Sequence, residues 1–234
     1  MNIKNSNILI TGGSSGIGKE TAKQFIAKGA NVLITGRDKK KLNNVSKEIG
    51  AVPLHFDISD LKAIPQKANE AINLLGGSIN VLVNNAGIGV FPELGEITEK
   101  DLFTVYSTNV FGLALFTQEL LPVFKKQQAG NIINIGSTAS LKGFARGSVY
   151  AASKFALRGM SQSWQAELRK DNIRVSLINP SEVTTAFADS AREERVEEAN
   201  KLAAQDIAQT ILSVVEIRDK GFVPEVTIWA TNPF

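Results

Sequence analysis

Short apolar runs alternate with longer amphipathic stretches along the whole chain. The runs are rich in Ile, Val and Leu and lack strict apolar–polar alternation, which is typical of strands covered on both faces. They predict strands at Asn7–Thr11, Asn31–Thr35, Val52–Phe56, Asn80–Asn84, Asn131–Gly136, Arg174–Asn179 and Glu225–Ala230. The amphipathic stretches predict helices at Gly16–Lys28, Asp38–Ile49, Ser59–Leu75, Glu99–Gln127, Val149–Lys170 and Gln205–Arg218.

This alternation favours a parallel sheet with right-handed crossover helices. We therefore predict an α/β fold: a single doubly wound domain over residues 1–234, with about seven strands and helices on both faces. The chain has no Pro- or Ser-rich linker and no repeat of fixed period. Residues 184–204, rich in Ala, Glu and Arg, fit either a helical lid or an ordinary surface helix.

Composition narrows the possible chemistry. The 234 residues are 43% hydrophobic and 21% charged, as in soluble globular proteins, and the net charge of +3 is too small to indicate a nucleic-acid partner. The absence of Cys and the presence of one His exclude disulfides, thiolate zinc sites, cysteine nucleophiles and paired-histidine metal sites. That histidine, His55, is expected to be a strand residue. We see no signal peptide or membrane span, so we expect a cytoplasmic protein with no metal and no membrane partner.

A glycine-rich loop follows the first predicted strand. The sequence Gly12-Gly13-Ser14-Ser15-Gly16-Ile17-Gly18 connects that strand directly to a helix. Gly12 permits a tight turn, Gly16 allows the backbone to approach a pyrophosphate, and Gly18 allows the helix to pack closely on the strand. The helix N-terminus offers N–H groups to the phosphates. The loop therefore predicts a dinucleotide site, with a glycine turn that serves packing alone as the alternative.

The sequence of this glycine loop also resembles a motif of a known protein family. Thr-Gly-x-x-x-Gly-Ile-Gly resembles the cofactor motif of the short-chain dehydrogenase/reductase family, and Asn84-Asn85-Ala86-Gly87 is similar to that family's next motif in sequence and position. The resemblance implies that the second motif stabilises the central sheet and lines the cofactor site. Taken alone, the tetrapeptide also fits a strand-to-loop turn.

A tyrosine and a lysine are the candidate proton-transfer pair. Tyr150 stands four residues before Lys154, so a helix places both on one face. A phenol with a pKa of about 10 is a poor acid or base at neutral pH, but a nearby ammonium and an oxidised nicotinamide lower that pKa. Tyr150 could then exchange a proton with a carbonyl or alcohol oxygen. A half-buried Tyr beside an extended Lys is the structural alternative.

The family resemblance completes this pair to a catalytic tetrad. Ser137 lies thirteen residues before Tyr150, the spacing of the family's serine, which bonds the substrate oxygen. Asn109 matches the family's helix asparagine, which holds a water in a proton relay to the lysine. The resemblance also implies that Pro180 ends a strand, that Val183 meets the nicotinamide carboxamide, and that Thr185 reaches the same group or the phosphates. Here the family's usual Gly after Pro180 is replaced by Ser181, which restricts the backbone.

The end of the second predicted strand bears on the choice of nicotinamide. NAD-preferring members of the family usually have an Asp at the position of Gly36, whereas Arg37 can pair with a 2′-phosphate. We therefore predict NADP, with NAD as the alternative because Asp38 could turn toward a ribose hydroxyl. Asp57 resembles the residue that contacts adenine, or it caps a helix. The predicted cofactor contacts are Gly12, Ser14, Ser15, Gly16, Ile17, Gly18, Arg37, Asp57, Ile58, Asn85, Ala86, Gly87, Tyr150, Lys154, Pro180, Val183 and Thr185.

Three loops are expected to select the substrate. Their candidate residues are Ile88, Phe91, Leu141, Phe144, Arg146 and Phe187. This set of mostly apolar side chains favours a small apolar or aromatic carbonyl compound as the substrate, with Arg146 as a candidate partner of a substrate carboxylate. The overall resemblance is to broad-specificity carbonyl reductases and hydroxy-acid dehydrogenases, which implies an NADP(H)-dependent oxidoreductase that forms a homodimer or homotetramer. A 3-ketoacyl thioester reductase of fatty-acid synthesis and a non-catalytic dinucleotide-sensing module are the alternatives.

Overall fold

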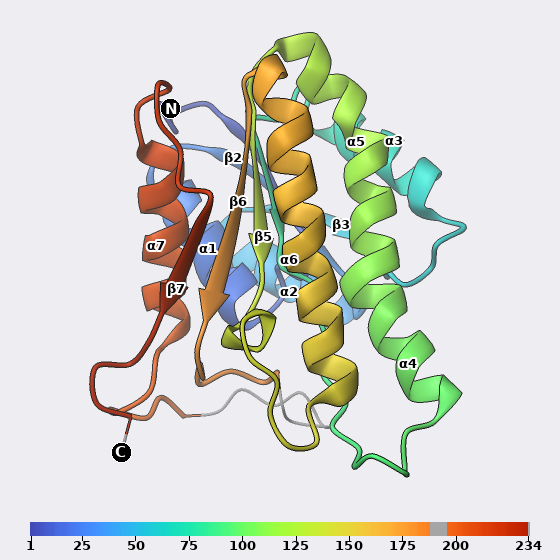
Figure 1. The fold of residues 1–234 in the computed structure, drawn as a ribbon. Helices are drawn as coiled ribbons and strands as arrows, with labels where there is room; N and C mark the ends of the chain where they lie inside the picture. Colours follow the sequence, from blue (N-terminus) through green and yellow to red (C-terminus); the bar gives the residue numbers. More distant parts are fainter. Residues whose placement is uncertain (188–195, 234) are drawn as a thin grey trace.

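Seven parallel strands form one sheet in the order β3-β2-β1-β4-β5-β6-β7 (Figure 1). The computed structural model describes residues 1–187 and 196–233. The strands are β1 (Asn7–Ile10), β2 (Asn31–Gly36), β3 (Val52–His55), β4 (Val81–Asn84), β5 (Gly130–Ile135), β6 (Ile173–Pro180) and β7 (Glu225–Ile228). The strand order reverses between β1 and β4. In open α/β sheets, ligands bind beyond the carboxyl ends of the strands at such a reversal.

Helices cover both faces of the sheet (Figure 1). One layer contains α1 (Gly16–Ala27), α2 (Lys39–Ile49) and α7 (Ala204–Glu216), and the other contains α3 (Ile64–Leu74), α5 (Leu113–Gln127) and α6 (Ser148–Leu168). In β1, Ile8 and Ile10 pack in the first layer while Leu9 packs in the second, as the alternation of side chains along a strand requires. The predicted doubly wound α/β fold is confirmed.

The predicted helix Glu99–Gln127 has the predicted bounds, but it is not α-helical throughout. The structure has α4 (Glu99–Tyr106), a π-helical segment η1 (Ser107–Gly112) and then α5. Gly112 packs so closely that a Cβ atom there would lie 2.1 Å from the carbonyl oxygen of Ile58. Single π-helical turns inside helices often occur at functional sites. This one contains Asn109, one of the predicted tetrad residues.

Two other predicted segments differ from the structure. The helix predicted from Ser59 begins at Ile64, with Pro65 in its first turn, because the chain before it is held in a turn by Asp57. Asp57 therefore does not cap this helix. Of residues 184–204, positions 188–195 lie outside the described residues. The described part contains no helix before α7, and the backbone N–H of Thr184 donates to Leu202 at 2.9 Å.

Candidate active site

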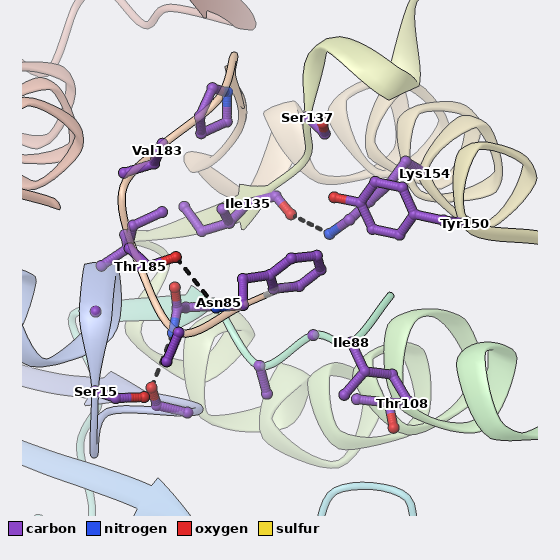
Figure 2. A pocket seen from close by; sticks show the side chains of 18 of the residues that line it. Ser15, Asn85, Ile88, Thr108, Ile135, Ser137, Tyr150, Lys154, Val183 and Thr185 are labelled. Carbon is purple, nitrogen blue, oxygen red and sulfur yellow. Dashed lines mark hydrogen bonds between the residues drawn. The ribbon is translucent and has the colours of Figure 1, made fainter. Parts of the chain in front are cut away.

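A cavity of about 1030 Å³ opens at the carboxyl ends of the strands, where the sequence predicts the site. It extends from the end of β2 past the N-terminus of α1 to α6. Figure 2 shows Ser137, Tyr150 and Lys154 on one side of it, with Val183 and Thr185 on the opposite side. The predicted residues that line it are Gly12, Ser14, Ser15, Gly16, Ile17, Arg37, Asp57, Ile58, Asn85, Ala86, Gly87, Ile88, Phe91, Ser137, Phe144, Tyr150, Lys154, Pro180, Val183, Thr185 and Phe187.

The glycine loop has the geometry that its sequence indicates. Gly12 has a φ of +67°, and a Cβ atom there would lie 2.9 Å from the Cα of Ala86. Gly18 does not line the cavity but packs beneath the loop, where a Cβ atom would lie 2.4 Å from the carbonyl oxygen of Gly12. These contacts require glycine at both positions. They bring the N-terminus of α1 to the cavity wall.

The first turn of α1 is suited to an anion. Ser15, its N-cap residue, makes no side-chain capping hydrogen bond, and the turn contains no acidic residue. The N–H groups and the positive end of the helix dipole are therefore available to a phosphate. The cradle of glycines in front of this turn fits a dinucleotide pyrophosphate.

Thr11 fixes the glycine loop to the loop after β4, and the sequence prediction did not single it out. Its hydroxyl oxygen accepts hydrogen bonds from the backbone N–H groups of Asn85 and Ala86, both at 3.0 Å. Asn85 Nδ2 donates in return to the carbonyl oxygens of Thr11 and Gly12 at 3.0 Å. The signal available in the sequence is the position of Thr11, directly between the strand and Gly12. The two predicted cofactor motifs thus form one rigid unit.

Ser137, Tyr150 and Lys154 lie together on one wall of the cavity (Figure 2). Ser137 follows β5, while Tyr150 and Lys154 lie one turn apart on α6, as predicted. The Tyr150 and Ser137 side chains share a hydrogen bond. Lys154 Nζ lies 5.8 Å from the centroid of the Tyr150 ring and donates to the carbonyl oxygen of Ile135 at 2.8 Å. The serine and the phenol therefore face the same part of the cavity, with the ammonium beside the phenol ring.

Burial governs the proton affinities of the pair. It raises the pKa of Tyr150 to about 12, and the hydrogen bond with Ser137 acts in the opposite direction. Burial lowers the pKa of Lys154 to about 8. The expected lowering of the Tyr150 pKa by Lys154 is therefore not met in the protein chain by itself. At neutral pH the phenol is protonated, which suits a proton donor.

Asn109 lies behind this wall rather than on the cavity surface. Its Oδ1 accepts from the backbone N–H of Ile88 at 2.9 Å, and its Nδ2 donates to the Ile88 carbonyl oxygen and to Ser153 Oγ. The side chain therefore joins the loop after β4 to α6, the helix that carries Tyr150 and Lys154. Its place in a proton relay stays a prediction.

Asp38 and Arg37 differ in what they can offer a nucleotide. Asp38 Oδ1 accepts from the backbone N–H of Lys41 at 2.9 Å and caps α2, so this oxygen already has a structural partner. Arg37 and Asp38 are both exposed and line the cavity, and no hydrogen bond to the Arg37 side chain is found among the described residues. His55 is a residue of β3, as expected, and its Nε2 lies 2.9 Å from the carbonyl oxygen of Arg37.

The family follows from comparison with known proteins. A family model described as short chain dehydrogenase matches residues 6–196, which is most of the chain. The chain belongs to the short-chain dehydrogenase/reductase family.

Individual relatives in this family are named as oxidoreductases. The chain is 32% identical over 241 residues to the NADP-dependent 3-hydroxy acid dehydrogenase of Schizosaccharomyces pombe, covering 96% of this chain and 92% of that protein. It is 35% identical over 215 residues to serine 3-dehydrogenase of Agrobacterium fabrum, covering 87% and 85%. A solved closed form of serine dehydrogenase complexed with NADP⁺ matches with a TM-score of 0.85 at 27% identity, covering 95% and 94%. The protein is an oxidoreductase.

Within this short-chain dehydrogenase/reductase, the predicted substrate residues divide into two groups. Phe91, Phe144 and Phe187 line the cavity together with Ile88. Leu141 and Arg146 are exposed and do not line it, contrary to the prediction. Arg146 Nε instead donates to the carbonyl oxygen of Phe91 at 3.1 Å, which ties two of the substrate loops together.

Within residues 1–187 and 196–233, no group of three or more His, Cys, Asp or Glu side chains could hold a metal ion. No helix in these two ranges is both long enough and apolar enough to cross a membrane.

Proposed function

We propose that this protein is an NADP(H)-dependent oxidoreductase that interconverts a small carbonyl compound and its alcohol by hydride transfer. The observation that carries the proposal is the placement of Ser137, Tyr150 and Lys154 in one cavity with the uncapped N-terminus of α1. A site for proton transfer and a site for phosphate thus share one space. This arrangement favours catalysis over a module that only senses a dinucleotide.

The residues of this chain fit a nicotinamide dinucleotide. The first turn of α1 would hold the pyrophosphate, Asp57 and Ile58 the adenine, and Val183 and Thr185 the carboxamide. When bound, NADPH supplies the hydride that reduces the carbonyl carbon. The choice of NADP over NAD is supported by Arg37, by the NADP-dependent relative from Schizosaccharomyces pombe and by the serine dehydrogenase complex with NADP⁺.

The chain's own groups handle the substrate oxygen. Ser137 positions that oxygen by a hydrogen bond, and Tyr150 donates its hydroxyl proton to it as the carbonyl is reduced. Lys154 places a cation beside the phenol and stabilises the phenolate that results. Asn109 holds the loop after β4 in register with α6. In alcohol oxidation Tyr150 instead accepts a proton, which requires its pKa to fall when a cationic cofactor is bound beside it.

The cofactor preference depends on Arg37. We expect Arg37→Ala to weaken the preference for NADPH over NADH by about 10- to 100-fold, because a charge-assisted hydrogen bond to the 2′-phosphate contributes about 1.5–3 kcal/mol. The ratio of kcat/KM with the two cofactors measures this preference. Lys40→Ala is the control, since Lys40 is an exposed cation nearby that does not line the cavity. An unchanged ratio in Arg37→Ala would show that the 2′-phosphate is recognised elsewhere.

Turnover of the purified protein tests the proposed function. Aldehydes, ketones, keto acids and 3-ketoacyl thioesters are each supplied with NADPH and, separately, with NADH. Consumption of the reduced cofactor that depends on Tyr150 supports the proposal. Turnover confined to the thioesters would favour a 3-ketoacyl thioester reductase. No turnover with any compound, together with tight cofactor binding, would favour a sensing module.

We also propose that the protein forms a homodimer or homotetramer through the helices on the α5–α6 face. Large apolar side chains are exposed on α4, η1, α5 and α6. They are Leu102, Phe103, Phe111, Leu115 and Phe155. Burial of such side chains against a second copy removes apolar area from water. Sedimentation equilibrium measures the assembly, and a monomer at all concentrations would contradict the proposal.

A further inference from the structure

Three loops each bring a phenylalanine to the end of the cavity that holds Tyr150. Phe91 follows β4, Phe144 precedes α6 and Phe187 follows β6. The ring centroids of Phe91 and Phe187 each lie 5.5 Å from that of Tyr150, and Phe144 lies 6.1 Å from Phe91. All three side chains line the cavity. The proton donor therefore stands among aromatic rings, and Phe91, Phe144 and Phe187 are here called the phenylalanine wall.

The rings of the phenylalanine wall are not fully buried, although Phe91 and Phe187 pack against the small core cluster that contains Tyr150. Phe144 is 50% exposed, and Phe91 and Phe187 are only partly buried, whereas Phe116 and Phe124 beneath the sheet are fully buried. Leaving apolar rings in water is unfavourable, and clustered exposed rings in a cavity indicate a surface that a ligand covers. Phe91 and Phe187 lie beside the Tyr150 ring, so the group that covers the wall would belong to the molecule whose oxygen reacts with the Tyr150 hydroxyl.

The backbone holds the wall in place. A Cβ atom at Gly89 would lie 2.6 Å from the ring of Phe91, and one at Gly147 would lie 2.8 Å from the ring of Phe144. Both rings therefore rest against glycine backbone. The hydrogen bond from Arg146 Nε to the Phe91 carbonyl oxygen joins the loops that carry these two rings. A preformed wall binds a flat partner with little loss of conformational entropy.

The charges around the cavity are arranged for a cofactor rather than for a substrate carboxylate. Among the described residues that line it, the cations are Arg37, Lys41 and Lys154. The first two lie near the end of β2, where a nucleotide phosphate is expected, and Lys154 already donates to Ile135. The acidic residues of the lining are Asp38, Asp57 and Glu182, and Glu182 forms an ion pair with Lys201 at 2.9 Å. A carboxylate placed against the phenylalanine wall would lose its hydration with no cation among these residues to replace it.

We propose that the substrate is an uncharged aryl aldehyde or aryl ketone, or the corresponding alcohol, whose ring packs on the phenylalanine wall. This rests on the proposed function. In reduction, a C–H bond of NADPH breaks and its hydride forms a new C–H bond at the carbonyl carbon. The C=O π bond breaks, and the oxygen takes the hydroxyl proton of Tyr150 to form an O–H bond. The products are the aryl alcohol and NADP⁺, and solvent returns the proton to Tyr150. The substrate class differs from the hydroxy acids and serine for which the relatives are named.

A matched set of aldehydes tests this inference. The full-length protein with NADPH is given benzaldehyde, cyclohexanecarbaldehyde, butanal and succinic semialdehyde. We expect kcat/KM for benzaldehyde to exceed that for cyclohexanecarbaldehyde by about 3- to 10-fold, as aromatic pairing predicts. Succinic semialdehyde is expected to be at least about 10-fold poorer than butanal because of its carboxylate. Phe144→Leu and Phe187→Leu should each reduce the benzaldehyde preference. Phe222→Leu should not, because Phe222 packs on Arg169 before β7, at the amino ends of the strands, and does not line the cavity.

Three results would overturn the inference and leave the proposed function intact. One is Tyr150-dependent turnover in which succinic semialdehyde exceeds butanal. Another is a benzaldehyde preference that is absent, or that neither Phe144→Leu nor Phe187→Leu changes. The third is oxidation of L-serine or a hydroxy acid with NADP⁺ when none of the four aldehydes is consumed. If no compound of either kind is turned over, the inference and the proposed function both fail.

Discussion

Tyr150→Phe should lower kcat by about 10²- to 10⁴-fold, the range associated with loss of a positioned proton donor. The substitution removes only the hydroxyl, which hydrogen-bonds to Ser137. The ring remains, and with it the contacts to Phe91 and Phe187 at 5.5 Å. Binding of substrate should therefore change much less than turnover. Steady-state kinetics with NADPH and the best aldehyde measure kcat and KM separately.

Tyr106→Phe is the matched control for this experiment. Tyr106 is the chain's other tyrosine, at the end of α4, where its ring lies 6.1 Å from that of Phe111. It does not line the cavity, so turnover should stay near that of the parent protein. Retention of most activity in Tyr150→Phe would mean that another group donates the proton. Equal losses in both variants would point to damaged folding, which the melting temperatures would reveal.

The fold could be predicted from the sequence because its hydrophobic pattern is that of buried parallel strands. All seven strands occur where their apolar runs indicate, since runs such as Val81–Asn84 are buried on both faces. The interruption at Ser107–Gly112 could not be predicted, because it depends on the close approach of Gly112 to Ile58, which is distant in sequence. The start of α3 depended on a local turn at Asp57 that the apolar periodicity does not encode.

The candidate site was predictable to the extent that short motifs fix local geometry. The glycine loop could be predicted from a strand followed directly by a turn and a helix. The pairing of Tyr150 with Lys154 could be predicted from their spacing of four residues on a helix. The Tyr150 pKa could not be predicted from these motifs, because burial by residues far along the chain raises it. The Arg146 Nε donates to the Phe91 carbonyl oxygen because two loops meet there, a contact that the sequence alone does not reveal.

Lys154→Met should reduce activity by at least about 10²-fold and change how the stability of the protein depends on pH. Lys154 is buried, and its Nζ donates a hydrogen bond to the Ile135 carbonyl oxygen. A fall in its pKa from 10.5 to about 8 corresponds to a folding penalty on the order of 3 kcal/mol. Methionine is of similar length and carries no charge, so the variant escapes this penalty while losing the cation that serves Tyr150.

The direction with pH follows from the two pKa values. Below pH 8 both the folded and the unfolded chain hold the Lys154 proton, so the parent carries the full penalty. Between pH 8 and pH 10.5 the folded state is neutral and the penalty shrinks, and above pH 10.5 it is gone. Lys154→Met should therefore lose stability relative to the parent by on the order of 3 kcal/mol as the pH rises from 7 to beyond 10.5.

Urea unfolding of both proteins at pH 7 and near pH 10.5 measures this difference, and titrations common to both cancel in it. Lys220→Met, at an exposed lysine, is the control and should show no comparable change. A difference that is constant with pH would mean that Lys154 is not desolvated in the folded protein. Loss of activity together with the predicted pH trend would show that the active site retains a charge that weakens the fold, a common relation between catalytic function and stability.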